Sequence, residues 1–166
     1  YLAVSDDWGH SWTVIPDTPW TMQSPLSPKS PFRMLMFFQM GKNYADNTDG
    51  YVYALGVGWG WFWDFIGANR VYLCRVPRNA VTDYSAYQYY TGMIGAFPAW
   101  SDDADAAAPL DGLYVGETVN AVYHPYLQRF FSLTQFGLFE APNPWGPWIM
   151  SSRLLNLGDE HEGLGY

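Results

Sequence analysis

The chain has few charged residues and a single cysteine. Asp, Glu, Lys and Arg make up only 14% of its 166 residues. This share is too small for a solvated helical surface or a disordered tail. The lone Cys74 cannot form a disulfide within the chain. It lies in the apolar run RVYLCRVP, so we interpret it as a buried small residue and not as a catalytic thiol.

Basic residues are scarce as well. Eight Lys and Arg stand against sixteen Asp and Glu, which gives a net charge of −8. Because phosphate binding needs a basic stripe, nucleic acid is not an expected partner. The three His are not at metal-ligand spacing, and a phosphate loop of the required form is missing, so we expect neither a metal nor a cofactor. An acidic chain rich in aromatic residues suits neutral or cationic ligands, sugars among them.

Long hydrophobic runs are also missing. No run reaches roughly eighteen apolar residues, so we expect no membrane span. The sequence has no initiator Met and no signal peptide, and it starts at Tyr1, inside a segment typical of a strand. We therefore expect a processed or truncated piece of a longer, secreted protein.

Aromatic and turn-forming residues are abundant instead. Aromatic residues account for 19% of the chain, and sixteen Gly and twelve Pro interrupt it often. The best helical candidate is 79–90, and a short turn explains that segment equally well. An acidic loop is predicted at 101–112. Short apolar segments bounded by turn residues predict strands at 1–4, 32–40, 51–57, 70–76, 118–124, 129–135 and 137–141.

Many short strands at regular spacing predict an all-β fold, namely a sandwich, a barrel or a propeller. Loose self-similarity between the strand pairs of 47–77 and those of 116–148 favours a propeller with antiparallel blades. A propeller is built from repeated sheets around one axis, so a repeating order of strands is the pattern it requires.

The segment SDDWGHSW at 5–12 matches the Asp-box, a hairpin turn of sialidase-like propellers. The Asp carboxylate accepts N–H groups of its own turn, and Gly relaxes the backbone at the tight point. The closing Trp12 needs its ring buried against the hairpin. These demands are structural, so Asp6 and Asp7 are not candidates for the active site.

Three further segments carry a resemblance to a known family: GKNYADNTDGYVYALG, VYLCRVPRNAVTDYSAYQYYTG and VYHPYLQRFF with GLFEAPNPWGPW. Over roughly 41–150 the chain resembles secreted β-propellers catalogued as a domain of unknown function, some of which are endo-D-arabinanases. The resemblance implies a five-bladed propeller whose central funnel binds a glycan, that is, a polysaccharide or oligosaccharide.

The chain is too short for five blades. A blade takes about 40–50 residues, and only about three can be traced. We assign 1–150 to an incomplete propeller that lacks its N-terminal blades, and 151–166 to a C-terminal tail or closing strand. Another chain or a missing segment would complete the ring.

The resemblance implies glycoside cleavage, which normally needs two carboxylates across the scissile bond. Asp46 and Asp49 precede the predicted inner strand 51–57, and Glu117 precedes the strand 118–124. These three are the catalytic candidates. The alternative interpretation is a polar turn for the two Asp residues and a solvated strand end for Glu117.

Sugar-binding candidates surround a Trp-rich segment. Trp59, Trp61 and Trp63 alternate along one predicted strand face, with Asp64 pointing the opposite way. Such a face stacks on sugar rings, but it is also typical of a core packed between blades. Arg70 and Arg75 flank a strand, and either could hold a carboxylate or a sugar hydroxyl. Of the two, Arg70 joins the list of substrate-binding candidates.

Three functions remain open. The first is a glycoside hydrolase that cleaves a furanose-rich, arabinan-like polysaccharide. The second is a carbohydrate-binding propeller without catalysis. The third is a structural or assembly protein whose exposed blade edges pair between chains. The hydrolase is preferred by a narrow margin, and it rests on the resemblance because a fold alone does not define a function.

Overall fold

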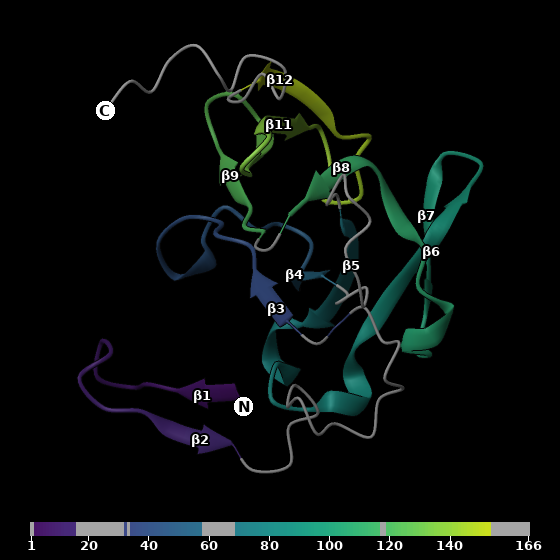
Figure 1. Cartoon of the computed structure of the whole chain (residues 1–166). Helices are drawn as coiled ribbons and strands as arrows, with labels where there is room; N and C mark the ends of the chain where they lie inside the picture. Colours follow the sequence, from purple (N-terminus) through teal and green to yellow (C-terminus); the bar gives the residue numbers. More distant parts are fainter. Residues whose placement is uncertain (1, 16–31, 33, 58–68, 117–118, 154–166) are drawn as a thin grey trace, which may run out of the picture.

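The computed structural model describes residues 2–15, 32, 34–57, 69–116 and 119–153 (Figure 1). Within these ranges the chain forms twelve strands and four short 3-10 helices, and no α-helix. The strands make three sheets, in which every pair of neighbouring strands is antiparallel. The predicted all-β class is therefore confirmed.

The smallest sheet is an N-terminal hairpin. It joins β1 (Leu2–Val4) to β2 (Thr13–Ile15). Several large apolar side chains of this hairpin are exposed, and Trp12 exposes 64% of its surface. The expectation that Trp12 is buried is wrong, because the described residues that contact its ring belong to the hairpin turn itself.

The largest sheet has six strands, and its centre is the long strand β5. Its path runs β3-β4-β5-β6-β7, and β8 pairs with β5 as well. One edge of β5 is shared, because its first half pairs with β8 and its second half with β6. The strands are β3 (Met34–Phe37), β4 (Tyr51–Val57), β5 (Asn69–Pro77), β6 (Gln88–Ile94), β7 (Phe97–Ser101) and β8 (Pro109–Val115).

The third sheet is a four-stranded meander with the order β12-β11-β10-β9. Each strand pairs with the next along the chain, so short turns suffice to connect them. The strands are β9 (Val122–His124), β10 (Arg129–Leu133), β11 (Gly137–Ala141) and β12 (Ile149–Arg153).

The two larger sheets touch at two backbone positions. Gln39, just after β3, forms a parallel bridge with Val122 of β9. Its N–H donates to the Ala121 carbonyl over 2.8 Å, and its own carbonyl accepts from the N–H of Tyr123 over 2.8 Å. At the second position, the Trp148 N–H donates to the backbone carbonyl of Asp111 in β8 over 3.1 Å. A Cβ on the adjacent Gly112 would lie 1.9 Å from the Trp148 carbonyl oxygen, so this close approach requires glycine.

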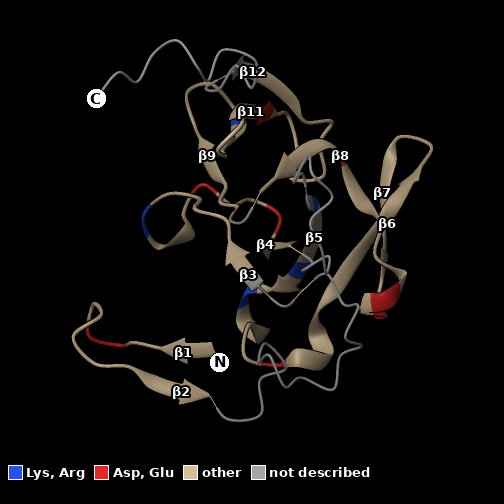
Figure 2. Ribbon diagram, viewed as in Figure 1, with Lys and Arg blue, Asp and Glu red and all other residues tan. Residues whose placement is uncertain are grey.

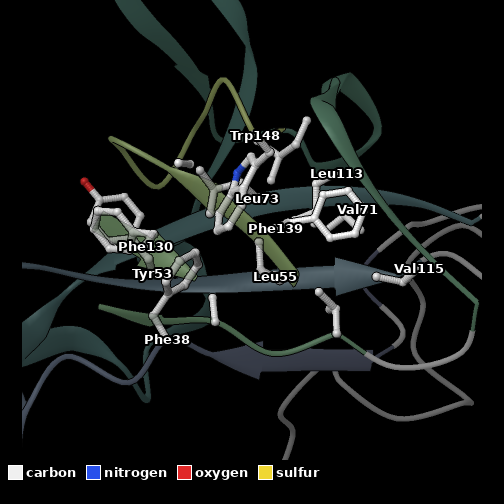
Figure 3. Packing of buried hydrophobic residues seen from close by; sticks show 14 of the residues in the cluster. Phe38, Tyr53, Leu55, Val71, Leu73, Leu113, Val115, Phe130, Phe139 and Trp148 are labelled. Carbon is white, nitrogen blue, oxygen red and sulfur yellow. The ribbon is translucent and has the colours of Figure 1, made fainter. Parts of the chain in front are cut away.

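The main core fills the space between these two sheets (Figure 3). Leu55 and Leu73 come from the six-stranded sheet, and Phe139 and Trp148 come from the meander side. The opposite face of the six-stranded sheet carries a second core that includes Cys74. Burial raises the pKa of the Cys74 thiol, which confirms its interpretation as a buried structural residue.

The connections hold the four 3-10 helices: η1 (Lys42–Tyr44), η2 (Arg78–Ala80), η3 (Tyr84–Ala86) and η4 (Ala104–Ala106). The helix considered for 79–90 is absent there, because that segment forms η2, η3 and the start of β6. The closely spaced tyrosines of the segment 79–90 favour a strand over an α-helix. The loop predicted at 101–112 is also shorter than expected, since Ser101 ends β7 and Pro109 begins β8.

Several expectations concern the whole architecture. The three sheets do not close into a ring over the described residues, so the five-bladed propeller stays a prediction. Of the predicted tail at 151–166, residues 151–153 belong to β12, and the remainder lies outside the described residues. In the part of the chain that the structure describes, no helix has the length and hydrophobicity needed to cross a membrane.

Candidate functional site

The predicted catalytic residues fall into two groups. Asp46 and Asp49 lie in the loop 41–50, which connects β3 to β4. Glu117 lies outside the described residues, directly after β8. Of the predicted sugar-binding residues, Trp59, Trp61, Trp63 and Asp64 lie outside the described residues too.

The loop 41–50 has an unusual backbone. Asn43 and Tyr44 both adopt positive φ, at 58° and 59°, which non-glycine residues rarely do. Arg78 supports this conformation from the end of β5, because its guanidinium donates to the carbonyls of Asn43 and Tyr44. Its backbone N–H donates to Gly50 over 2.9 Å. The loop is therefore held at both ends, as is common where strain is kept at a functional site.

Asp46 is half-buried against the start of this loop. Its N–H donates to the Met40 carbonyl over 3.1 Å. A Cβ built on Gly41 would lie 2.3 Å from Asp46 Oδ2, and Gly41 itself has a φ of 74°. Only glycine leaves room for the Asp46 carboxylate in this position.

Asp49 is exposed and accepts three hydrogen bonds. Oδ1 accepts from the Tyr51 N–H over 3.0 Å and from Asn47 Nδ2 over 2.9 Å. Oδ2 accepts from the Tyr53 hydroxyl over 2.6 Å. The first bond is ordinary turn chemistry. The bond to Tyr53 goes further, because it fixes the carboxylate to a side chain of the sheet.

Tyr53 connects the loop to the core. Its ring is 1% exposed, and its N–H donates to the Tyr44 hydroxyl over 3.1 Å. Burial raises the Tyr53 pKa, and the Asp49 carboxylate raises it further, while Arg75 acts in the opposite sense. Burial also raises the pKa of Tyr44 to about 12. Both phenols therefore keep their protons at neutral pH.

Arg75 is the basic residue of this site. It lies directly opposite Tyr53 on β4 and Gln88 on β6. Its guanidinium carbon is 4.1 Å from the ring centroid of Tyr51 and 4.0 Å from that of Trp100. Nε donates to Gln88 Oε1 over 2.9 Å. Stacking of this kind fixes the orientation of the guanidinium and contributes cation–π attraction.

The predicted residue Arg70 is an exposed residue at the other end of β5, where it pairs with Tyr114. The structure thus brings together Asp49, Tyr53 and Arg75, and it does not bring Arg70 to them. The alternation along β5 contained a signal for this choice, since Arg75 shares its sheet face with Val71 and Leu73 of the main core.

The segment 5–12 forms a turn held by its own hydrogen bonds. Asp7 Oδ1 accepts from the Ser11 N–H over 2.8 Å, and Oδ2 accepts from its hydroxyl over 2.7 Å. Ser5 Oγ accepts from the Gly9 N–H over 2.7 Å. The bonds from Ser11 are the main reason that the pKa of Asp7 is lowered to about 2. All these bonds stay inside the turn, in keeping with a structural role.

The cluster around Asp49 offers a carboxylate, two phenols, a guanidinium and the rings of Tyr51 and Trp100. Such a set can accept hydrogen bonds from hydroxyl groups, donate to oxygen atoms and stack on an apolar ring face. Acidic and basic residues are otherwise spread thinly over several loops and strands (Figure 2). Among the described residues, no group of three or more His, Cys, Asp or Glu could hold a metal ion.

A protein-family model matches residues 1–160. Its description is Domain of unknown function (DUF4185). The chain belongs to this family. A comparison with curated proteins finds no match. The DUF4185 match spans all three sheets and the loop 41–50, so the cluster around Asp49 is part of the family domain.

Proposed function

We propose that this DUF4185 chain is a glycan-directed, secreted propeller that acts as a glycoside hydrolase on a furanose-rich, arabinan-like polysaccharide. The observation that carries the proposal is the cluster of Asp49, Tyr53 and Arg75, in which Arg75 lies against the rings of Tyr51 and Trp100. Sugars need both kinds of contact, because a sugar ring has an apolar face and a polar rim of hydroxyl groups.

Four features support blades of a propeller. The meander β9–β12 is a four-stranded antiparallel sheet, the usual blade. The six-stranded sheet is covered on both faces, as a blade between two others would be. The first strands of the two larger sheets run parallel where Gln39 meets Val122, as inner strands around one axis do. The turn at 5–12 carries the hydrogen bonds expected of an Asp-box.

The proposed mechanism uses two carboxylates across the scissile bond. Asp46 and Asp49 belong to one loop, and Glu117 comes two residues after the end of β8 in the sequence. We assign Glu117 and one of the two Asp residues to the acid/base and nucleophile pair. A separation of about 5–5.5 Å would give retention of configuration, and about 6.5–9.5 Å would give inversion. No metal or cofactor takes part in this proposal.

Release of reducing ends from arabinan tests the hydrolase. We expect E117Q and either D46N or D49N to lower the rate by roughly 10²–10⁴-fold, the usual contribution of a positioned acid or base. D83N is the matched control, because Asp83 also accepts from a nearby N–H and hydroxyl, those of Ser85, but it caps the N-terminus of η3. Full activity in E117Q and in both Asp variants would refute the catalytic assignment.

The second candidate is a carbohydrate-binding propeller without catalysis. The half-buried ring of Trp100 beside Arg75 favours it, because this ring can report and support sugar stacking without any reaction. Quenching of Trp fluorescence by arabino-oligosaccharides, without release of reducing ends, would select this function over the hydrolase.

A further inference from the structure

The guanidinium of Arg75 is held by neutral groups. The guanidinium carbon lies 4.1 Å from the ring centroid of Tyr51 and 4.0 Å from that of Trp100. Nε donates to the amide oxygen of Gln88, and the guanidinium also hydrogen-bonds the Tyr53 hydroxyl. Over the described residues, the negative charge that acts through this network is that of Asp49, which is reached through the Tyr53 hydroxyl. An Arg side chain stays charged at every ordinary pH. The protein thus keeps an oriented, half-buried cation without a carboxylate placed directly on it.

The geometry restricts how a ligand can reach this cation. Two aromatic rings lie against the guanidinium and Nε is used, so a ligand would approach through the Nη atoms, beside the Tyr53 hydroxyl. The Nη edge presents parallel N–H groups in a fixed plane, which match two oxygen atoms of a carboxylate or sulfate. A neutral sugar hydroxyl needs one donor or acceptor and no fixed pair.

The surroundings favour a sugar as the carrier of that oxyanion. Tyr51 and Trp100 flank the cation with aromatic faces, and Asp49 stands beside it as an acceptor for hydroxyl groups. Lys42 belongs to the loop 41–50, and Arg78 supports this loop through its hydrogen bond to the Asn43 carbonyl. The Arg78 guanidinium carbon lies 6.0 Å from the Tyr44 ring centroid, while the Lys42 ammonium lies 6.0 Å from the ring centroid of Trp8.

We propose that the Nη edge of Arg75 binds the negatively charged group, carboxylate or sulfate, of an acidic sugar residue in the glycan. The inference rests on the proposed function and makes it narrower, because it names an acidic glycan as the preferred ligand. Arg75 is then a specificity-determining residue, and the rings of Tyr51 and Trp100 keep it in position.

Calorimetric binding to the unmodified protein is the first test. The probes are an oligogalacturonate, its methyl ester, a neutral arabino-oligosaccharide of equal length and its sulfated form. We expect each acidic probe to bind roughly tenfold or more tightly than its neutral counterpart, since a charge-assisted hydrogen bond contributes more than a neutral one. Preference for the sulfated or for the uronate probe identifies the source of the charge.

Substitutions test whether the tighter binding of the acidic probes depends on Arg75. R75Q should abolish the advantage of the acidic probe, and R75K should restore part of it. R129Q is the matched control, because Arg129 is half-buried like Arg75 but belongs to β10 of the four-stranded sheet, and R129Q should leave all affinities unchanged. The comparison of acid with ester in the unmodified protein needs no variant, so a misfolded R75Q would not remove the test.

The outcomes separate the two proposals. Equal binding of the acidic and neutral probes would overturn the inference and leave glycan binding intact. An acidic preference that survives in folded R75Q would overturn it as well. Binding of none of the four probes would count against the proposed function itself.

Discussion

At the residue scale, the sequence identified the loop of the site but not its cation. Asp46 and Asp49 were predicted from their position before a strand, and the structure describes both in the loop 41–50. Arg70 and Arg75 could not be separated from composition, because both flank the same strand. The choice depends on what lies across the sheet, and the partners Tyr53 and Gln88 are set by strand register.

Replacing Tyr53 by Phe removes the 2.6 Å bond to the Asp49 carboxylate. We expect the free energy of unfolding to fall by about 1–3 kcal/mol, as for a bond to a charged group, and the glycan affinity to fall as well. Denaturant unfolding and calorimetry measure the two effects.

Y87F is the control for Tyr53. The Tyr87 hydroxyl donates to the Val81 carbonyl over 2.8 Å, and its ring belongs to the second core. We expect this variant to lose stability and to keep its glycan affinity. If Y53F and Y87F change affinity alike, Tyr53 acts on folding alone.

Replacing Gly41 by Ala should displace the Asp46 carboxylate. The new Cβ would lie 2.3 Å from Asp46 Oδ2, and φ is 74°. G50A is the matched control, since Gly50 has a φ of 80° and a Cβ there would meet nothing within 4 Å. Both variants bear the cost of positive φ, about 1 kcal/mol or more. We expect G41A to lose more stability than G50A in denaturant unfolding, and equal losses would contradict the clash.

At the element scale, the strands with clear bounds were predicted well. The segments 51–57 and 137–141 coincide with β4 and β11, because mainly apolar runs stand between strong turn signals. The strands β6 and β7 were missed. Gly92, Gly95 and Pro98 interrupt their pattern, and these residues are accommodated by a bulge and a tight turn that only pairing reveals.

The hairpin β1–β2 should respond to acid through Asp7. The hydrogen bonds from Ser11 lower the Asp7 pKa from 3.8 to about 2. A lowered pKa means that the carboxylate stabilises the turn above about pH 4, and that this stabilisation is lost as pH falls toward 2. The Ser11 amide chemical shift, followed from pH 6 to pH 1.5 by NMR, should show the transition.

Two substitutions check the assignment to Asp7. D7N should abolish the acid transition of the Ser11 backbone amide, because the asparagine side chain does not titrate in this pH range. D6N should preserve it, because Ser11 donates its hydrogen bonds to Asp7 and not to Asp6. A transition that persists in D7N would show that another group controls the turn.

At the scale of the whole molecule, the sequence predicted the all-β class but not the sheet order. The contact of Gln39 with Val122 joins segments far apart in the chain, and no local pattern encodes such a pairing. The two cores likewise depend on which sheet faces meet. The near-continuous apolar run of β5 indicates two buried faces, but it does not say which strands cover them.

The shared core predicts that the two larger sheets unfold together. Phe139 is fully buried between them. F139A should lower the free energy of unfolding by about 3–5 kcal/mol, the usual cost of deleting a buried aromatic ring. Ile149 is the control, because it lies in β12 with 55% of its surface exposed, and I149A should cost far less.

Near-UV and far-UV circular dichroism can follow the same unfolding. A single transition is expected at both wavelengths, in the parent and in F139A. Two separated transitions would indicate that the sheets unfold independently.

The divided edge of β5 has a consequence for how such a domain can vary. The hairpin β6–β7 is fastened to the sheet only near its base, at Cys74 and Arg75, while its tip bears the exposed Ile94 and Phe97. Residues can therefore be added to or removed from the tip without moving the base, where Gln88 and Trp100 hold the cation. Related chains can therefore lengthen or shorten the β6–β7 hairpin, and so change how far the domain extends along a polymer, without changing the Arg75 site at the base of the hairpin.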